Sequence, residues 1–266
     1  KTRLDFGYQT GWGQITKKAD LLNTEEYLQI RNEAIKNAGE TVGPSDYDLN
    51  GVWSKDAYTD WQKVLIGNTS HYTNIQATIS GGSDGTQFLA GGGYIRETTV
   101  FMGDYSDTKG NARLSINHSS KNKRFEFSLS TNYLQDLNKL PLVDFTATAI
   151  TLAPNAPEMY TSDGGINWQP KPDNPNSVTF TQNPAVALLR KYKANTSNLM
   201  ANSSIGYKIL QDLNLKATFG YNKLQTDELT LIPQTSFSPL TTRNRRTASY
   251  TTKGLSAWII DPQLTY

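Results

Sequence analysis

The sequence predicts an all-β protein and, more narrowly, a segment of a transmembrane antiparallel β-barrel. Eight stretches place apolar residues at every second position, which is the period of a strand with one apolar face. The connections between them alternate between long and short, as in a barrel wall with large loops at one rim and tight turns at the other. The stretches run for about ten residues, which at ~3.3 Å per residue and a tilt of about 40° spans an outer-membrane apolar band of roughly 25 Å.

Composition favours strands over helices as the membrane-spanning elements. The 266 residues are 36% hydrophobic, their mean hydropathy is −0.55, and no run of roughly 18 apolar residues is present. The net charge of +2 argues against a dedicated nucleic-acid-binding protein. The absence of cysteine excludes disulfides and thiolate metal sites. The 14 Tyr, 5 Trp and 9 Phe suit aromatic girdles at a membrane surface, although soluble β-proteins are also rich in them.

The first five strands are separated by a connection of about sixty residues, a glycine-rich turn (Gly81–Gly85), a medium loop (Glu97–Lys109) and a second short turn (Ser119–Lys123). The residues that we expect on the apolar face are, strand by strand, Leu4, Phe6 and Tyr8; Thr73, Ile75, Ala77 and Ile79; Phe88, Ala90, Gly92 and Tyr94; Ala112, Leu114 and Ile116; and Phe125, Phe127, Leu129, Thr131 and Tyr133. Gly91, Gly92 and Gly93 lie within the third strand, where they favour curvature or close packing over phosphate binding.

The first long connection contains the one short loop helix that the sequence predicts, over residues 24–38. Asn23 is placed to cap it, Glu26 completes a capping box, and Gly39 ends it. Its apolar residues lie at helical spacing, so we expect the helix to pack on a surface through Tyr27, Ile30, Ala34 and Ile35.

The last three strands follow a second connection of about sixty residues, Gln135–Asn195, which holds most of the prolines. Loops of this length are uncommon in compact domains and are usually functional. A short turn (Leu210–Asp212) joins the sixth and seventh strands, and a loop over residues 228–254 leads to the eighth. The apolar residues of these strands are Leu199, Ala201, Ile205, Tyr207 and Ile209; Leu215, Ala217, Phe219 and Tyr221; and Trp258, Ile260, Leu264 and Tyr266.

Both ends of the chain read as strands, without an initiator Met or a signal peptide at the start. A sheet cut at both ends leaves two unpaired edges, which natural domains avoid. We therefore expect residues 1–266 to be one partial barrel domain of a longer protein.

Several motifs together resemble the SusC/RagA-type TonB-dependent outer-membrane transporters, in the first part of their barrel. The resemblance runs from end to end of the chain and is carried by the opening strand (residues 1–9), Leu22–Tyr27, Thr59–Gln62, Asn74–Gly82, Gly92–Tyr94 and Asn111–Arg113. Each motif is weak alone, but the Trp-containing motif and the Ser-Gly-Gly turn are fairly specific together.

The resemblance implies a 22-stranded barrel in the bacterial outer membrane, surrounded by outer-membrane lipid and plugged by an N-terminal domain. It also implies a SusD-like surface lipoprotein as partner and TonB, acting through the plug, as the source of energy. The cargo would be a glycan, an oligosaccharide or a peptide too large for a porin. The plug and the remaining strands do not belong to residues 1–266, so this segment alone should neither close a barrel nor transport.

No constellation for catalysis, metal or cofactor binding stands out, and we expect a protein that is not an enzyme. The two histidines, His71 and His118, lie at strand positions and are best read as solvated or interfacial. The run Asp46, Asp48 and Asn50 before Gly51 matches the start of a calcium loop, but Ala57 stands where a bidentate Glu belongs. A polar turn and a cation site both remain open there.

Aromatic residues in the long loops are the better candidates for ligand binding. Trp53, Tyr58, Tyr160 and Trp168 stand among Asn, Asp, Ser and Thr, a mixture that stacks on sugar rings and hydrogen-bonds their hydroxyls. The alternative is that they pack small cores within the loops. We expect the Gln135–Asn195 loop to contact the lipoprotein or the ligand.

Two other functions fit parts of the pattern. A soluble carbohydrate-binding β-domain would use the same aromatic residues, and solubility without detergent would favour it. A self-standing eight-stranded outer-membrane barrel fits the strand count but not the large loops.

Overall fold

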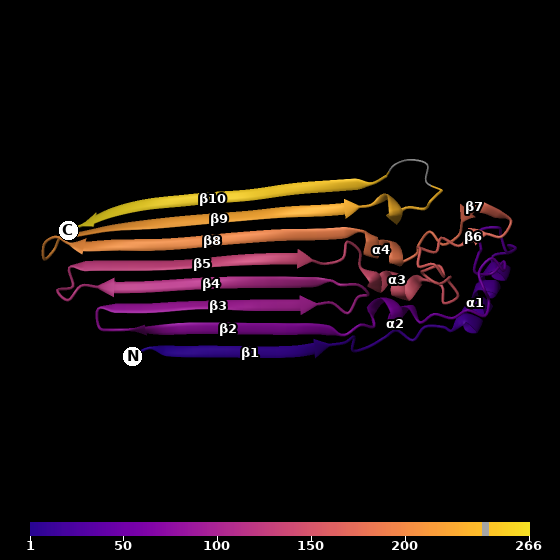
Figure 1. The fold of residues 1–266 in the computed structure, drawn as a ribbon, viewed down its shortest axis with the longest axis horizontal. Helices are drawn as coiled ribbons and strands as arrows, with labels where there is room; N and C mark the ends of the chain where they lie inside the picture. The colour runs from indigo at the N-terminus through magenta and orange to yellow at the C-terminus, as the bar shows by residue number, and fades with distance from the viewer. Residues whose placement is uncertain (241–244) are drawn as a thin grey trace.

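The computed structural model describes residues 1–240 and 245–266, which form an eight-stranded antiparallel sheet with the order β1-β2-β3-β4-β5-β8-β9-β10 (Figure 1). Its strands are β1 (Arg3–Gly13), β2 (Ser70–Gly82), β3 (Thr86–Thr98), β4 (Ser106–Ser119), β5 (Phe125–Lys139), β8 (Lys191–Lys208), β9 (Asn214–Ile232) and β10 (Thr247–Thr265). A two-stranded sheet pairs β6 (Pro170–Lys171) with β7 (Asn174–Val178). The all-β, antiparallel fold is as predicted.

The strands reach further into the long loops than the alternation predicted. The medium loop expected at residues 97–109 is reduced to 99–105, because β3 runs to Thr98 and β4 begins at Ser106. The Gln135–Asn195 connection shortens to residues 140–190 for the same reason. Beyond the predicted apolar residues the strict alternation is lost, so the pattern ends there while the backbone hydrogen bonds continue. Residues 241–244 of the loop predicted at 228–254 lie outside the described residues.

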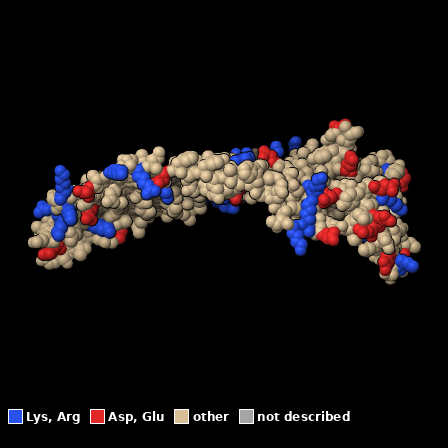
Figure 2. Space-filling model, turned by 90° about the horizontal axis from the view of Figure 1, so that it is seen from below, with Lys and Arg blue, Asp and Glu red and all other residues tan. Residues whose placement is uncertain are grey.

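The register places the predicted apolar residues of all eight strands on one face, here called the apolar face. Residues directly opposite each other in an antiparallel pair point to the same side. One row across the sheet reads Leu4, Ile79, Ala90, Leu114, Thr131, Ala201, Tyr221 and Trp258. The opposite, polar face is rich in Asn, Gln, Ser and Thr. Seen edge-on, charged side chains gather at the two ends of the molecule and are sparse between them (Figure 2).

The apolar residues form a band that slopes across the strands at one residue per strand. At its lower edge, near the short turns, the apolar residues of β3 end at Phe88. Four strands further across the sheet, the residue of β9 that is level with Phe88 is Phe219. The apolar residues of β9 continue four positions beyond it, to Leu215. The turn end of the sheet in Figure 1 steps outward in the same direction.

The upper edge of the band has the same slope. Toward the long loops, the apolar residues of β3 end at Tyr94, and the residue of β9 that is level with Tyr94 is Gln225. The apolar run of β9 already ends at Tyr221, four positions closer to the short turns. A rise of ~3.3 Å against a strand spacing of ~4.8 Å corresponds to a tilt of about 35°. Strands in membrane barrels tilt by about 35–45°.

The polar face of the sheet is hollowed near the short turns. Cavities of about 410 and 430 Å³ lie on it near the short turns, lined mainly by polar residues such as Gln87, Asn117 and Ser128. In mid-sheet, the Arg113 guanidinium crosses β3 to donate to Thr78 Oγ1 at 3.2 Å. A Cβ on Gly91 would lie 3.1 Å from Arg113 Nε, so a glycine is needed where this side chain passes. The close packing expected of the glycine run is confirmed.

The buried hydrophobic cluster of the described residues lies in the loops, because the single-layer sheet has nothing packed on its faces. Residues 14–69, 99–105 and 140–190, here called the loop head, gather at the end opposite the short turns (Figure 1). No helix within residues 1–240 and 245–266 is long and apolar enough to cross a membrane.

The loop head holds more helices than the one predicted. Helix α1 (Thr24–Asn37) has the expected capping box between Asn23 and Glu26. Three short helices were missed, α2 (Trp61–Ile66), α3 (Phe145–Thr151) and α4 (Ala185–Leu189), along with the 3₁₀ turn η1 (Gln234–Ser236). Elements of five to seven residues are too short to show a helical period and depend on tertiary packing.

The predicted apolar stripe of α1 is wrong in part. Ile30 is 53% exposed and Ala34 is also exposed. The helix is held instead by polar contacts. Thr24 is buried and its hydroxyl donates to the Ala57 carbonyl at 2.7 Å, while Tyr27 and Arg31 reach the 46–48 turn.

Candidate functional site

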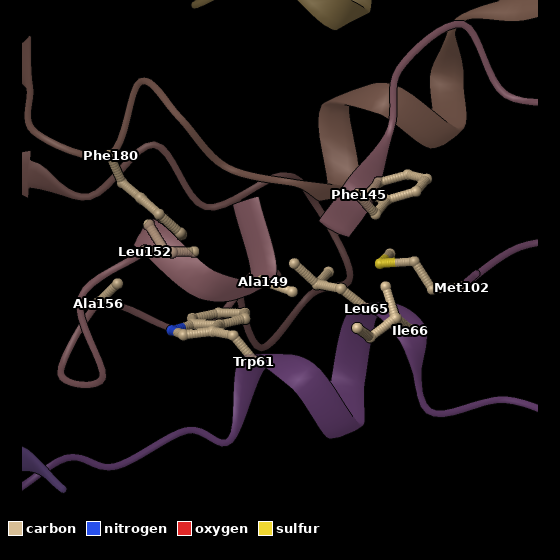
Figure 3. Packing of buried hydrophobic residues seen from close by; sticks show 9 residues of the cluster. All are labelled: Trp61, Leu65, Ile66, Met102, Phe145, Ala149, Leu152, Ala156 and Phe180. Atoms are coloured by element: carbon tan, nitrogen blue, oxygen red, sulfur yellow. The ribbon is translucent and has the colours of Figure 1, made fainter. Parts of the chain in front are cut away.

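Three loops share one hydrophobic core in the loop head (Figure 3). The first loop contributes the residues of α2, the β3–β4 loop contributes Met102, and the β5–β8 loop contributes α3 and Phe180. The buried members are Trp61, Leu65, Ile66, Met102, Phe145, Ala149, Leu152, Ala156 and Phe180. Segments far apart in the sequence are thereby held as one body.

Hydrogen bonds join the same loops across the core. Trp61 Nε1 donates to the Ala153 carbonyl at 2.9 Å. The fully buried Asn155 amide donates to the carbonyls of Asp48 at 3.0 Å and Ser54 at 3.2 Å. Buried polar groups need partners of this kind, so these contacts also define how the loops are aligned.

The Thr59–Gln62 motif has a structural role at each of its last three positions. Asp60 caps α2 by accepting from the Lys63 amide at 2.9 Å. Trp61 enters the core, and the Gln62 side chain binds both the amide and the carbonyl of Ala19, at 2.8 and 2.9 Å. The motif therefore closes the first loop onto the core.

A cavity of about 370 Å³ opens beside this motif. Its volume lies toward the low end of the range for small-molecule binding sites, about 300–1,000 Å³. Its walls mix exposed apolar side chains with charged ones, and they include Lys18, Leu21, Leu22, Tyr27, Tyr58, Asp60 and Ile150. Such a lining can hold a peptide side chain or a sugar ring.

A charge cluster supports the wall of this cavity from α1. Arg31 Nε lies 2.9 Å from Asp48 Oδ2, Arg31 Nη2 lies 3.1 Å from Asp46 Oδ1, and the Tyr27 hydroxyl donates to Asp48 at 2.9 Å. Burial opposes ionisation of Asp48, but the hydrogen bonds from Arg31 and Tyr27 outweigh it and lower the pKa of that carboxyl. Burial and the Asp48 carboxylate raise the pKa of Tyr27 to about 12.

Arg31 occupies the position that a cation would take among the calcium-loop residues. Both carboxylates bind its guanidinium, Asp46 also accepts from the Gly43 amide at 2.8 Å, and the Asn50 amide donates to backbone carbonyls. The arrangement of Asp46, Asp48 and Asn50 matches the polar turn, the first of the two alternatives left open by the sequence. Within the described residues no group of three or more His, Cys, Asp or Glu side chains is placed to hold a metal ion.

Two of the four aromatic candidates contact Thr179 and Phe180, Trp53 through its side chain and Trp168 through its backbone carbonyl. Trp53 is half-buried, donates from Nε1 to Thr179 Oγ1 at 2.9 Å and packs edge-on against Phe180 at 5.9 Å between ring centroids. The Trp168 carbonyl accepts from the amides of Thr179 and Phe180. Trp53 and Trp168 therefore meet at the same short segment of the β5–β8 loop.

The other two aromatic candidates remain open to solvent. Tyr58 is 59% exposed and lines the 370 Å³ cavity. Tyr160 is 41% exposed and pairs with Ile166 across a small turn. The cavity residues Leu21, Leu22 and Ile150 were not singled out from the sequence, because nothing local marks an exposed apolar residue as part of a wall.

The two histidines lie in or beside the sheet, as predicted. His71 stacks edge-on with Trp12 at 6.4 Å, and His118 Nδ1 lies 2.8 Å from Thr86 Oγ1. Neither histidine is part of an ion pair found within residues 1–240 and 245–266.

Comparison with known proteins finds similarity in structure but not in sequence families. No protein-family model matches the chain, and no curated protein matches it. Three solved structures match with 16% sequence identity: the RagAB peptide importer in the closed-closed state (TM-score 0.66), the RagAB peptide transporter (TM-score 0.67) and the RagAB peptide importer in the open-open state (TM-score 0.66). The matches cover 90%, 90% and 96% of this chain.

The chain spans about 30% of the length of the solved chains that it matches. Those structures are described as a peptide importer or a peptide transporter, and at 16% identity the likeness concerns the fold. The resemblance to the SusC/RagA-type transporters is confirmed at the level of the fold, since 90% to 96% of this chain is similar in structure to part of the solved RagAB chains.

Proposed function

We propose that this chain forms part of the wall and the outer loops of a TonB-dependent importer in the bacterial outer membrane. The wall would separate outer-membrane lipid from a polar lumen. The loop head, working with a SusD-like surface lipoprotein, would capture a peptide or an oligosaccharide before a plug domain admits it.

The sloping apolar band is the observation that carries this proposal. A band with one residue of offset per strand becomes level when the strands tilt by about 35°, as they do in a membrane barrel. In water the same face would be a very large exposed apolar patch, which favours aggregation and counts against a soluble carbohydrate-binding domain. The long loops then lie together on one side of the membrane.

Peptides are the favoured cargo of the two classes. The similar solved structures are described as peptide importers, and the cavity beside Tyr58 mixes apolar walls with Lys18 and Asp60, which suits a peptide side chain with its backbone. The exposure of Tyr58 and Tyr160 makes them the aromatic residues proposed to touch a ligand, while Trp53 supports the loops through its bond to Thr179. The Gln135–Asn195 loop remains the segment proposed to meet lipoprotein or cargo.

The test uses the full-length protein that contains this segment. We expect it to fractionate with the outer membrane, to need detergent for extraction and to copurify with a lipoprotein. Uptake of a labelled peptide mixture should fall severalfold in a Tyr58→Ala/Tyr160→Ala variant and stay unchanged in the exposed control Ile30→Ala. Recovery of the protein in a soluble fraction without detergent would refute the proposal, and uptake of oligosaccharides alone would refute the peptide assignment.

A further inference from the structure

A second cavity, of about 490 Å³, lies where the sheet meets the loop head, and it is lined by cations. Lys139 ends β5, Lys191 and Lys193 begin β8, and Arg190 precedes them. Asp104 is the one carboxylate in the lining.

The cavity opens on the apolar face of the sheet. Lys193 and Leu199 are both odd-numbered positions of β8, so their side chains leave the strand on the same side. The register pairs Lys193 with Leu229 and Lys191 with Leu231, so two leucines of β9 lie beside the two lysines on that face. Cationic groups and an apolar surface are thus presented together.

The cations of this cavity lack acidic partners. None of the ion pairs found among the described residues includes Lys139, Arg190, Lys191 or Lys193. The Arg190 guanidinium lies 5.6 Å from the centre of the Phe237 ring, and its Nε atom is buried without an acceptor.

On the polar face some cations are paired, Lys109 with Asp107 and Lys253 with Glu228. Others, such as Arg113 and Lys216, are in none of the ion pairs found among the described residues. Unpaired cations beside an apolar surface are suited to a ligand that is anionic at one end and apolar at the other.

The height of the cavity above the apolar band narrows the class of ligand. Lys193 lies six positions beyond Leu199, the last apolar residue of the band on β8, which at ~3.3 Å per residue and a tilt of about 35° is roughly 16 Å. A phospholipid headgroup layer is only about 5–7 Å thick on each side of the membrane. A lysine side chain can extend several ångströms toward the membrane, but this does not close the gap between the level of Lys193 and the top of a phospholipid headgroup layer. A lipid with a thick, acidic saccharide headgroup does extend to this level.

We propose that this cavity binds the phosphorylated saccharide headgroup of a glycolipid in the outer leaflet, with the lysines holding phosphate. The inference rests on the proposed membrane location. It assigns the lysines a role in anchoring lipid beside the base of the loop head, separate from cargo binding.

The experiment measures binding to the delipidated full-length barrel in a neutral detergent. The probes are a lipopolysaccharide that carries a phosphorylated core, the same lipid after enzymatic dephosphorylation, phosphatidylglycerol and inorganic phosphate. The wild type should prefer the phosphorylated lipopolysaccharide. A Lys191→Gln/Lys193→Gln variant should lose roughly tenfold to thirtyfold in affinity, and Lys191→Arg/Lys193→Arg should retain it. The control Lys121→Gln/Lys208→Gln removes two charges at the short-turn end and should bind as the wild type does.

Any one of three results would overturn the proposal. The Lys191→Gln/Lys193→Gln variant could bind the lipid as tightly as the Lys121→Gln/Lys208→Gln control, or the dephosphorylated lipid could bind as tightly as the phosphorylated one. The third is full competition by inorganic phosphate or phosphatidylglycerol. The Arg variant separates lost charge from lost folding, since a folding defect would appear in it as well. A barrel that inserts and imports but shows no such preference would contradict only this inference, whereas a chain found outside the membrane would contradict the proposed function.

Discussion

Arg31 shows how a single side chain decides between two readings of one sequence motif. Its guanidinium binds Asp46 and Asp48 at the same time, with Asp48 nearly buried. A charge in that position is costly without its partner, because the remaining carboxylate has lost both solvent and counter-ion. The turn after α1 therefore depends on a residue that lies outside the motif itself.

Replacing Arg31 by Met should destabilise the docking of α1 by about 2–3 kcal/mol, since it leaves the Asp48 carboxylate with the Tyr27 hydroxyl alone. Hydrogen exchange of the amides in α1 would measure the change. The matched control is Arg3→Met, which breaks the exposed pair with Asp5 and should have almost no effect. Equal protection of α1 in the two variants would contradict the assigned role of Arg31.

The same cluster predicts two limits of pH for α1 docking. The pKa of Asp48 is lowered in the folded state, so its contribution is present above the unfolded value of about 3.9 and is lost as pH falls through the lower folded value. The pKa of Tyr27 is raised to about 12, so its contribution is present below about pH 10 and is lost as pH rises toward 12. The tyrosinate absorbance of the wild type minus that of Tyr27→Phe measures the second limit. A midpoint near pH 10 in that difference would show that Tyr27 does not bind Asp48.

At the scale of elements, the loop head is held by α2 and α3 packing on each other rather than by helix propensity. Both helices are only two turns or less, and their stability comes from burying Leu65, Phe145 and Ala149. The Met102 amide donates to the Leu65 carbonyl at 2.9 Å, which adds the β3–β4 loop to the same unit.

Leu65→Ala should therefore open three loops together, at a cost of about 2–5 kcal/mol for a fully buried leucine. Hydrogen exchange should rise in α2, in α3 and at the Met102 amide alike. Ile30→Ala, at an exposed position, should leave all three unchanged. A rise confined to α2 would mean that the loops open independently.

The elements that the sequence predicts well are those with a local pattern. Alternation identifies all eight strands of the sheet, and Asn23 with Glu26 identifies α1, because a period or a cap is written into neighbouring residues. The short helices and the packing of Trp53 depend on partners about a hundred residues away, such as Thr179, and no local pattern encodes them. The strands were predicted too short for a similar reason, since their ends toward the long loops carry no alternating pattern.

For the whole molecule, the proposed membrane location places the two faces of the sheet in different media, with the slope of the band setting the tilt of the strands. Adjacent residues of one strand then have opposite requirements. Leu114 lies in the middle of the apolar run of β4, and Ser115 lies on the polar face.

Leu114→Arg should cost about 2–4 kcal/mol when the full-length barrel folds into lipid vesicles, while Ser115→Arg should cost well under 1 kcal/mol. Urea unfolding from the vesicles, followed by tryptophan fluorescence, compares the two. The pair has the same substituent and nearly the same depth, so equal losses would show that the apolar face does not meet lipid.

The shared core of the loop head also bears on how such a protein diversifies. Trp53 and Thr179 are 126 residues apart in the chain yet joined by one hydrogen bond, and α2 and α3 pack on each other from two different loops. A recombination event that exchanged one loop with a relative would bring in half of each contact and leave the other half unmatched. New cargo preference is therefore expected to arise by point changes on the outer surface of the loop head, or by inheritance of all its loops together, rather than by shuffling loops one at a time.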